Sequence, residues 1–369
     1  MKIYQVFESY PLFYQPYIPP TIEELSKKKG ISSKIITFSG ISDSTNVEVL
    51  PSYNRRRIQE FLFHKVNPQK KKLSFLEIKA LKEKIDIIHI QHSFLFSKVT
   101  SILEIPNNER PKIIITLRGG DTYIKPWVKK NWKVFFNIYG TKVDAFVVMS
   151  EDQKKYLTRW GVPLNRIHVI PISFGEEFKT EPKHPNKGTL KLISVFRMCW
   201  EKNIADNLRF VKQIKESGLP VQYDVYGDGQ DIGQLYYLLD KFGLNEEVNV
   251  KGKLENTLLK KKLNTYDFLL QLSHSESFGM SVVEAQTFGV PAIVSNVDGL
   301  GETVIHNHSG FVLERNFSMR EEANTIINLW KNESLYYTMS ANAIQFAQSS
   351  FNTNAEVGKL VNLYSKLVN

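Results

Sequence analysis

The chain has 369 residues, which fits two domains of ordinary size, and its hydrophobic content of 42% excludes a disordered protein. Its single cysteine, Cys199, excludes an internal disulfide framework and suits a reducing cytoplasm. The net charge of +10 favours an anionic partner, although nucleic acid is the weaker candidate because no recognised nucleic-acid module accompanies the charge.

The first half of the chain alternates short apolar strands with helical stretches. Strands are predicted at residues 3–7, 34–38, 85–90, 113–116, 145–148 and 167–170. The first of these reads as a strand and not as a signal peptide, and no apolar run in the sequence is long enough to span a membrane. A helix is predicted over residues 21–29, with Thr21 and Glu24 as its capping box.

The second half repeats this pattern after a linker at residues 173–188, which are rich in charge, Pro and Gly. Its strands are predicted at residues 191–195, 222–226, 249–251, 268–272, 292–295 and 311–313. Continuous apolar strands with intervening helices indicate parallel sheets that are covered on both faces. The predicted fold is α/β, with two doubly wound Rossmann-like domains at residues 1–172 and 189–352.

The most informative motif places two carboxylates, Glu276 and Glu284, eight residues apart. One helix would point them about 80° apart, so it could not aim both at one ligand atom. The spacing instead predicts Glu276 on a loop and Glu284 in the first turn of the next helix. Residues 277–279 then form the turn whose free backbone N–H groups can hold a diphosphate. The structural alternative is a capping box made by Ser281 and Glu284.

Two cations, Arg197 and Lys202, follow the first strand of the second half. At the mouth of the sheet they could stabilise a departing nucleoside diphosphate without a metal, and a structural ion pair is the alternative. The sequence contains no Asp-x-Asp pair and no Cys/His cluster with zinc spacing. We therefore expect no metal and no cofactor.

These motifs resemble a known family. The two-glutamate motif, with GLGE at residues 299–302 and SGFV at residues 309–312, closely resembles the retaining GT-B glycosyltransferases of the group 1 type, which use nucleotide-sugar donors. The resemblance extends over nearly the whole chain and is strongest over residues 192–313. It implies two Rossmann-like domains that face a cleft, and a last helix at about residues 353–369 that packs back on the first domain.

The resemblance also implies roles for individual residues. Glu276 would contact the sugar hydroxyls, Glu284 the ribose hydroxyls, and Arg197 and Lys202 the diphosphate. The implied nucleotide-sugar-binding set is Glu284, Phe278, Gly279, Met280, Ser281, Lys251 and Gly227. The family usually has Gly where Phe196 stands, and we expect this departure to tighten the pocket.

The first domain departs from the family at two places. Residues 8–17, which include several aromatic side chains, replace a Gly-Gly loop and suggest an aromatic platform for the acceptor. Arg118 stands in the region where relatives often carry a sugar-contacting His. Arginine cannot shuttle protons near neutral pH, but it can stabilise negative charge, so Arg118 joins Glu276, Arg197 and Lys202 in the predicted catalytic set.

The predicted function is that of a retaining hexosyltransferase. It moves a sugar from a nucleoside diphosphate sugar, with UDP as the expected nucleotide, to a saccharide or lipid-linked acceptor in surface polysaccharide or glycolipid synthesis. Two alternatives stay open: a nucleotide-sugar epimerase of the same architecture, and a degenerate non-catalytic relative that binds carbohydrate or membrane.

The placement of the positive charge predicts a membrane partner. Residues 1–180 hold 29 Lys and Arg against 17 Asp and Glu, whereas the rest of the chain hold 19 against 21. Within residues 55–84, Arg-Arg-Arg at 55–57 and Lys-Lys-Lys at 70–72 flank Phe61, Leu62 and Phe63. This stretch predicts docking of a cytoplasmic protein on the anionic inner face of the plasma membrane. The alternative is a solvated basic surface, with the three apolar residues packed in the core.

Overall fold

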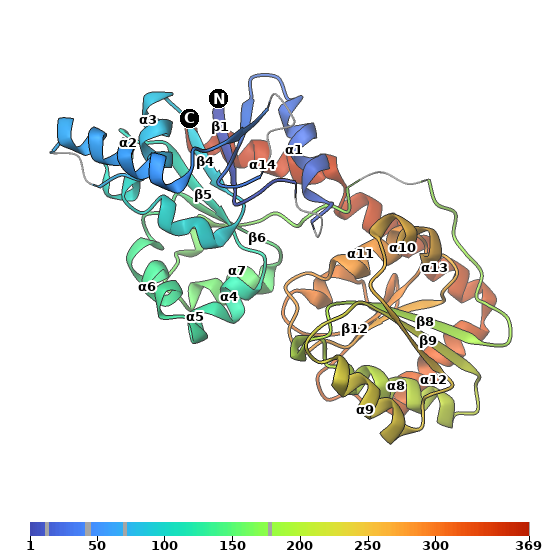
Figure 1. The fold of residues 1–369 in the computed structure, drawn as a ribbon. Coiled ribbons are helices and arrows are strands. Elements are labelled where there is room, and N and C mark those ends of the chain that lie inside the picture. The colour runs from blue at the N-terminus through green and yellow to red at the C-terminus, as the bar shows by residue number, and fades with distance from the viewer. Residues whose placement is uncertain (12–14, 41–45, 69–71, 176–178, 369) are drawn as a thin grey trace. The chain divides into compact units, whose positions relative to one another are not determined.

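The computed structural model describes residues 1–11, 15–40, 46–68, 72–175 and 179–368. They form two compact units, each built around one parallel sheet (Figure 1). Unit 1 comprises Met1–Gly175 and Thr353–Asn369, and unit 2 comprises Glu176–Asn352. The chain therefore leaves unit 1 once and returns to it for the last helix.

Unit 1 contains a seven-stranded sheet in the order β3-β2-β1-β4-β5-β6-β7. The strands are β1 (Lys2–Phe7), β2 (Ser32–Thr37), β3 (Val47–Val49), β4 (Ile87–Ile90), β5 (Lys112–Thr116), β6 (Ala145–Val148) and β7 (Ile167–Val169), and all pairs are parallel. Strand β6, with the sequence AFVV, is buried along its whole length, as expected for a parallel strand covered on both faces.

Helices cover both faces of this sheet. They are α1 (Ile18–Ser26), α2 (Tyr53–Val66), α3 (Phe75–Lys82), α4 (Gly120–Tyr123), α5 (Lys125–Val128), α6 (Lys130–Tyr139), α7 (Glu151–Thr158) and α14 (Thr353–Val368), with 3-10 turns η1 (Ser93–Lys98), η2 (Ile102–Glu104) and η3 (Leu164–Arg166). Helix α14 packs beside α1 (Figure 1). On that face Ile18 and Ile22 contact the sheet, whereas Leu76 of α3 and Trp132 of α6 belong to the core on the opposite face.

Unit 2 contains a six-stranded sheet in the order β10-β9-β8-β11-β12-β13. Its elements are β8 (Leu190–Val195), η4 (Trp200–Lys202), α8 (Ile204–Glu216), β9 (Val221–Tyr226), α9 (Ile232–Phe242), β10 (Val248–Gly252), α10 (Asn256–Leu263), β11 (Phe268–Gln271), α11 (Met280–Thr287), β12 (Ala292–Ser295), η5 (Leu300–Thr303), β13 (Gly310–Leu313), α12 (Met319–Lys331) and α13 (Glu333–Ser350). The chain moves from β8 to β9 on one side and later to β11 on the other. The carboxyl ends of β8 and β11 therefore flank a topological switch point, where open α/β sheets bind ligands.

The predicted fold class is confirmed, and two local predictions need correction. The edge strand β3 was not predicted, because three half-buried residues give too short a pattern. Helix α1 begins at Ile18 and not at Thr21, since Pro19 and Pro20 occupy its first turn, where no backbone N–H is needed. The Thr21 hydroxyl donates to Glu356 at 2.8 Å and does not cap the helix.

Among the helices of the described ranges, none is long and apolar enough to cross a membrane.

Candidate active site

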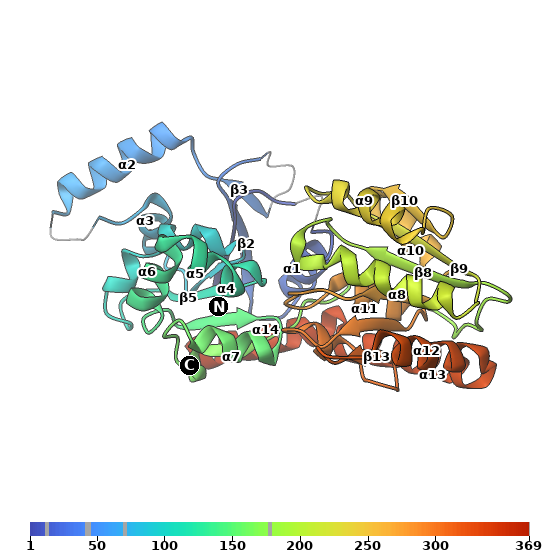
Figure 2. The same ribbon diagram turned by 90° about the horizontal axis from the view of Figure 1, so that it is seen from below.

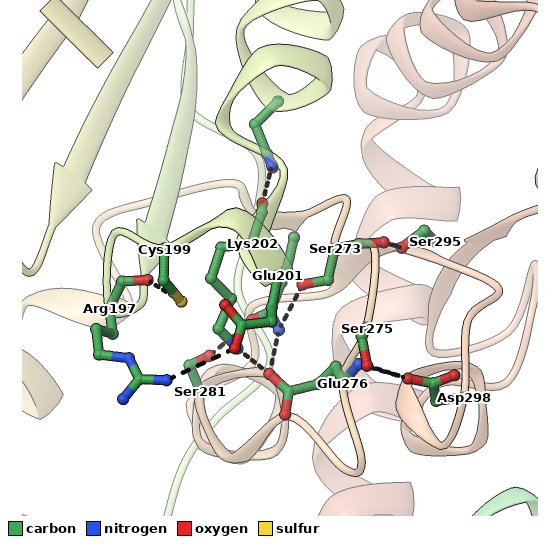
Figure 3. Close-up of polar contacts among 12 residues, drawn as sticks. Arg197, Cys199, Glu201, Lys202, Ser273, Ser275, Glu276, Ser281, Ser295 and Asp298 are labelled. Atoms are coloured by element: carbon green, nitrogen blue, oxygen red, sulfur yellow. Dashed lines mark hydrogen bonds and ion pairs between the residues drawn. The ribbon is translucent and has the colours of Figure 1, made fainter. Parts of the chain in front are cut away.

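The candidate site lies in unit 2, at the loops that follow β8 and β11. Glu276 stands on the loop between β11 and α11, as predicted from its spacing. Figure 3 shows its side chain pointing toward Lys202 of η4, whose Nζ donates to Glu276 Oε2. Gln271 Nε2 donates to the same oxygen at 3.2 Å. The Lys202 and Glu276 side chains are only 17% and 18% exposed, so each charge depends on the other and on Gln271.

Backbone hydrogen bonds tie the two loops together. The carbonyl oxygen of Glu201 accepts from the backbone N–H of His274 at 2.7 Å and of Ser275 at 3.3 Å. On the far side of the loop, Asp298 Oδ2 accepts from the Glu276 backbone N–H at 3.1 Å and from the Ser275 hydroxyl (Figure 3). These bonds fix the carboxylate of Glu276 opposite Lys202.

Arg197 lies at the same mouth but is held more loosely. Its Nη2 is 4.0 Å from Glu201 Oε1, and its side chain is 75% exposed (Figure 3). An ion pair this long and this exposed contributes little free energy, so the guanidinium can turn to an anionic ligand.

The turn before α11 requires glycine for two reasons. Gly279 has φ +87°, and a Cβ there would lie 2.7 Å from Leu300 Cδ1. As the N-cap of α11 it offers no side-chain acceptor to the first helical turn, in which the N–H groups of Val282 and Val283 donate to the Gly279 carbonyl oxygen. Phe278 is buried against Phe351, with ring centroids 5.2 Å apart. Residues 278–281 thus form a rigid helix start that suits an anion.

The capping-box alternative for Glu284 is wrong. Because Gly279 is the N-cap, Glu284 falls in the second turn of α11, one turn later than predicted. The Ser281 hydroxyl donates to Gln271 Oε1 at 2.9 Å, and Glu284 accepts from Asn256 Nδ2 at 3.1 Å. Burial raises the pKa of Glu284, while the Asn256 hydrogen bond and the charge of Lys260 oppose that rise.

A polar chain therefore crosses the site. It runs from Ser281 at the start of α11, through Gln271 at the end of β11, to Glu276 and Lys202. Gln271, Asp298 and Asn256 were missed by sequence reasoning. A signal existed for Gln271, because it is the polar last residue of an otherwise apolar buried strand.

Three predicted positions have mainly structural surroundings. Gly227 has φ +127°, and a Cβ there would lie 1.9 Å from the carbonyl oxygen of Phe196, so glycine is needed to pack two loops together. The Phe196 ring is buried in the unit 2 core, and its effect on the width of the pocket stays a prediction. Lys251 of β10 lies 3.8 Å from Asp224 Oδ2.

Arg118 belongs to unit 1, at the carboxyl end of β5. Its Nη1 donates to the Gln91 backbone oxygen, and its Nη2 donates to Gln91 Oε1 at 3.0 Å. It lines a pocket within unit 1, together with His89, Thr116 and Glu356. Burial, and secondly the Arg118 charge, lower the pKa of His92 to about 4, so this histidine is neutral.

The predicted aromatic platform at residues 8–17 also belongs to unit 1, and its residues 12–14 lie outside the described residues. In the described part, the Tyr10 ring packs 4.9 Å from that of Phe7. Within the described ranges, no group of three or more His, Cys, Asp or Glu side chains could hold a metal ion.

The family models of known proteins cover both units. Residues 22–172 match the Glycosyltransferase Family 4 model, and residues 176–346 match the model of the Glycosyl transferases group 1. The chain belongs to the group 1 family of glycosyltransferases. The family prediction is confirmed, and the two-glutamate motif of this glycosyltransferase lies inside the group 1 match.

Individual relatives match over most of their length. An uncharacterized glycosyltransferase of Methanocaldococcus jannaschii is 26% identical over 348 residues, which are 92% of each chain. N-acetyl-alpha-D-glucosaminyl L-malate synthase of Bacillus anthracis is 25% identical over 297 residues, which cover 77% of this glycosyltransferase and 76% of the synthase. The crystal structure of Anabaena HepE in complex with UDP-glucose shares the fold, with a TM-score of 0.71 and 16% identity over 99% of this chain and all of that one.

The turn geometry leads to a prediction about Gly279. Gly279→Ala should lower the thermal midpoint of unfolding, because a strained φ costs about 1–3 kcal/mol and the added Cβ meets Leu300. The matched control is Gly233→Ala on α9 of the same unit, where a Cβ meets nothing within 4 Å. That control should keep or raise the midpoint. Equal midpoints for the two variants in calorimetry would contradict the strained turn.

Proposed function

We propose that this glycosyltransferase is a retaining enzyme that transfers a sugar from a UDP-sugar to a saccharide acceptor without a metal. The observation that carries the proposal is the ion pair of Glu276 and Lys202 beside the start of α11. One small region thus offers a carboxylate for hydroxyl groups, a cation for phosphate and the N-terminal end of a helix, which favours an anion. The UDP-glucose bound to the HepE structure, which has the same fold, supports UDP as the nucleotide.

In the proposed reaction the diphosphate lies at the start of α11, beside Lys202 and Arg197. The bond from the anomeric carbon to the phosphate oxygen breaks, and negative charge grows on the departing UDP. The two cations and the helix start stabilise that charge where it develops. The acceptor oxygen bonds to the same face of the anomeric carbon, and its proton passes to the leaving phosphate. No protein base is needed, which is compatible with Arg118 in place of a histidine.

The two glutamates are proposed to have different tasks. Glu276 binds the sugar hydroxyls. Its contact with Lys202 is replaced by these hydroxyls when the diphosphate binds that lysine. Glu284, buried one turn into α11 and held by Asn256, binds the ribose hydroxyls. The ribose contacts are the same before and during the reaction, whereas the sugar changes shape as the bond breaks.

This division predicts separable effects of the two glutamates. Glu284→Ala should mainly weaken UDP binding, because ribose contacts stabilise ground and transition states alike. Glu276→Ala should leave UDP affinity largely unchanged and lower turnover at saturating donor. Calorimetric titration with UDP and steady-state assays measure the two quantities. An unchanged UDP affinity in Glu284→Ala would contradict the proposal that Glu284 binds the ribose.

The cations lead to a second prediction. Arg197→Ala and Lys202→Ala should each lower turnover by about 10²-fold or more, as is typical when a charge contact to the transition state is lost. Added EDTA should change the wild-type rate little, and strict dependence on a metal ion would overturn the scheme. Product analysis should find a sugar that has been transferred to the acceptor. An epimerised free nucleotide sugar would instead favour the epimerase, and the absence of any turnover would favour a non-catalytic relative.

We further propose that the acceptor is lipid-linked and is reached at the anionic inner face of the plasma membrane, in surface polysaccharide or glycolipid synthesis. Support comes from α2, a helix of unit 1 with no buried residue, which projects from the sheet (Figure 2). Phe63 packs partly against the core, but the other apolar residues point outward. Their exposed fractions are Ile58 60%, Phe61 67%, Leu62 54% and Val66 80%.

The outward face of α2 combines apolar and basic side chains. At 100° per residue, Arg55 and Lys65 fall within this apolar stripe, and the exposed Arg57 lies about 40° beyond its edge. The inward half is held by Glu60, which accepts from the Phe75 backbone N–H at 2.8 Å, and by Arg56, stacked over Phe38. Lys70 and Lys71 lie outside the described residues. An exposed apolar stripe with flanking cations suits an anionic bilayer surface.

Vesicle binding tests this face. The triple variant with Arg55→Ser, Arg57→Ser and Lys65→Ser should bind anionic vesicles about 10²-fold more weakly, because each cation contributes about 1 kcal/mol near such a surface. The matched control replaces three exposed lysines of unit 2, Lys241, Lys261 and Lys262, with Ser. Co-sedimentation at low salt gives the affinities. Equal binding by the two triple variants would assign the attraction to net charge and not to α2.

A further inference from the structure

We infer that unit 1 has a second bilayer-contacting surface on α5 and α6, which docks on the same anionic lipid surface as α2. The inference rests on the proposed membrane location of the acceptor and names a second contact that fixes how unit 1 lies on the lipid. This surface, called here the α5–α6 patch, consists of Trp127, Val128, Val134 and Ile138 with Lys129, Lys130 and Lys133.

The α5–α6 patch is apolar and basic at once. Trp127 is 57% exposed, Val128 69%, Val134 41% and Ile138 48%, although α6 buries Trp132, Phe135 and Phe136 on its other side. The three lysines are exposed, and across the described residues no ion pair involves any of them. Residues 122–143 contain no Asp or Glu. The lysines therefore keep their full charge for an external partner.

The indole of Trp127 is held in place while it remains exposed. Its Nε1 donates to the Tyr156 hydroxyl at 3.1 Å, its ring meets the Trp160 ring edge-on at 4.9 Å, and the Arg159 guanidinium lies 5.0 Å from its centroid. A side chain ordered in advance loses little conformational entropy on binding. Tryptophan also favours the boundary between lipid headgroups and acyl chains, where one end of the ring is apolar and the other wet.

The composition of the patch favours lipid over a saccharide or a protein partner. A saccharide platform combines an aromatic ring with carboxylates that accept from hydroxyl groups, and this segment has none. The exposed aliphatic side chains of Val128, Val134 and Ile138 would neither stack on a sugar ring nor hydrogen-bond to its hydroxyl groups. Lysines whose long stems lie along apolar surface can reach phosphate groups while the valines and the indole enter the lipid. The patch thus matches the charge and the polarity gradient of an anionic leaflet.

The patch and α2 belong to the same side of unit 1. The inner side chains Trp132 and Phe135 of α6 lie in one hydrophobic core with Leu76 of α3, and Phe63 of α2 packs against that core. This is the face of the sheet opposite α1. One helix lying on a bilayer leaves the domain free to roll about the helix axis, whereas two separate contacts remove that freedom. Joint contacts also bind more tightly than either alone, because the second forms within one molecule.

The experiment uses the full chain and vesicles of phosphatidylcholine, with or without an equal share of phosphatidylglycerol. The triple variant with Lys129→Ser, Lys130→Ser and Lys133→Ser, and the double variant with Trp127→Ser and Val128→Ser, should each bind anionic vesicles at least about tenfold more weakly. Matched controls on unit 2 are the Lys241, Lys261 and Lys262 triple variant and the pair Tyr236→Ser and Tyr237→Ser, which are equally exposed. Near-wild-type binding by both patch variants, or losses matched by the controls, would overturn the inference.

A second readout does not depend on affinity. Brominated anionic lipids should quench the fluorescence of the bound wild-type protein, and Trp127→Phe should remove most of that quenching although four other tryptophans remain. Unchanged quenching in Trp127→Phe would place the patch away from the lipid. Loss of a dimer in the patch variants during sedimentation, with vesicle binding intact, would assign the patch to a second copy.

Hydrolysis of UDP-sugar, with water as the acceptor, separates this inference from the proposed function. The patch variants should hydrolyse the donor at the wild-type rate, because the patch contains none of the donor-site residues. If no variant and no wild-type protein turns over any donor, the proposed function fails while the vesicle result still stands. If the donor is turned over normally but the patch makes no contact with lipid, the proposed enzymatic function stands and the α5–α6 patch is not a membrane surface.

Discussion

The candidate site of this glycosyltransferase depends on the adjacency of β8 and β11 in the sheet of unit 2. The two strands pair in parallel, with Leu192 opposite Phe268, so the loops that follow them emerge at one edge. Lys202 and Glu276, 74 residues apart in the chain, meet there. A half-enclosed charge without a partner is costly, so each keeps the other in place while the site holds no ligand. A ligand with sugar hydroxyls and a diphosphate can give Glu276 and Lys202 new partners at the same time. A ligand without the diphosphate would separate the pair and leave Lys202 without an opposite charge.

The same edge sets two carboxylates in different surroundings. Glu276 is on a loop braced by Asp298 and the Glu201 carbonyl, next to a cation, and faces the mouth of the sheet. Glu284 is buried on α11 with Asn256 as its hydrogen-bond donor, and burial raises its pKa. A carboxylate beside a cation, such as Glu276, suits ligand groups whose position or charge changes during the reaction. A buried carboxylate, such as Glu284, suits a ligand group that stays in place. The eight-residue spacing produces this difference because a glycine turn lies between them.

Sequence patterns were sufficient for the loop position of Glu276 and for the strands other than the short edge strand β3. Parallel strands read as apolar runs, and a glycine before an apolar helix marks the turn. The patterns failed where a tertiary partner decided the local structure. Thr21 matches a capping box, yet prolines start α1 earlier and Glu356 takes the Thr21 hydroxyl. Ser281 likewise matches a capping box with Glu284, yet it bonds to Gln271.

The charge asymmetry of the chain has a structural counterpart in its exposed apolar surface. Of the nineteen exposed large apolar side chains among the described residues, nine lie on α2 or within residues 127–138. Both segments belong to the basic unit 1, and both pack their inner sides against one core. Apolar residues scattered singly over a surface need no explanation, but a concentration beside unpaired lysines and arginines does. Unit 2, which carries the donor-site residues, is nearly neutral by contrast. This concentration supports the proposals that unit 1 contacts a membrane surface where a lipid-linked acceptor lies and that unit 2 binds the nucleotide.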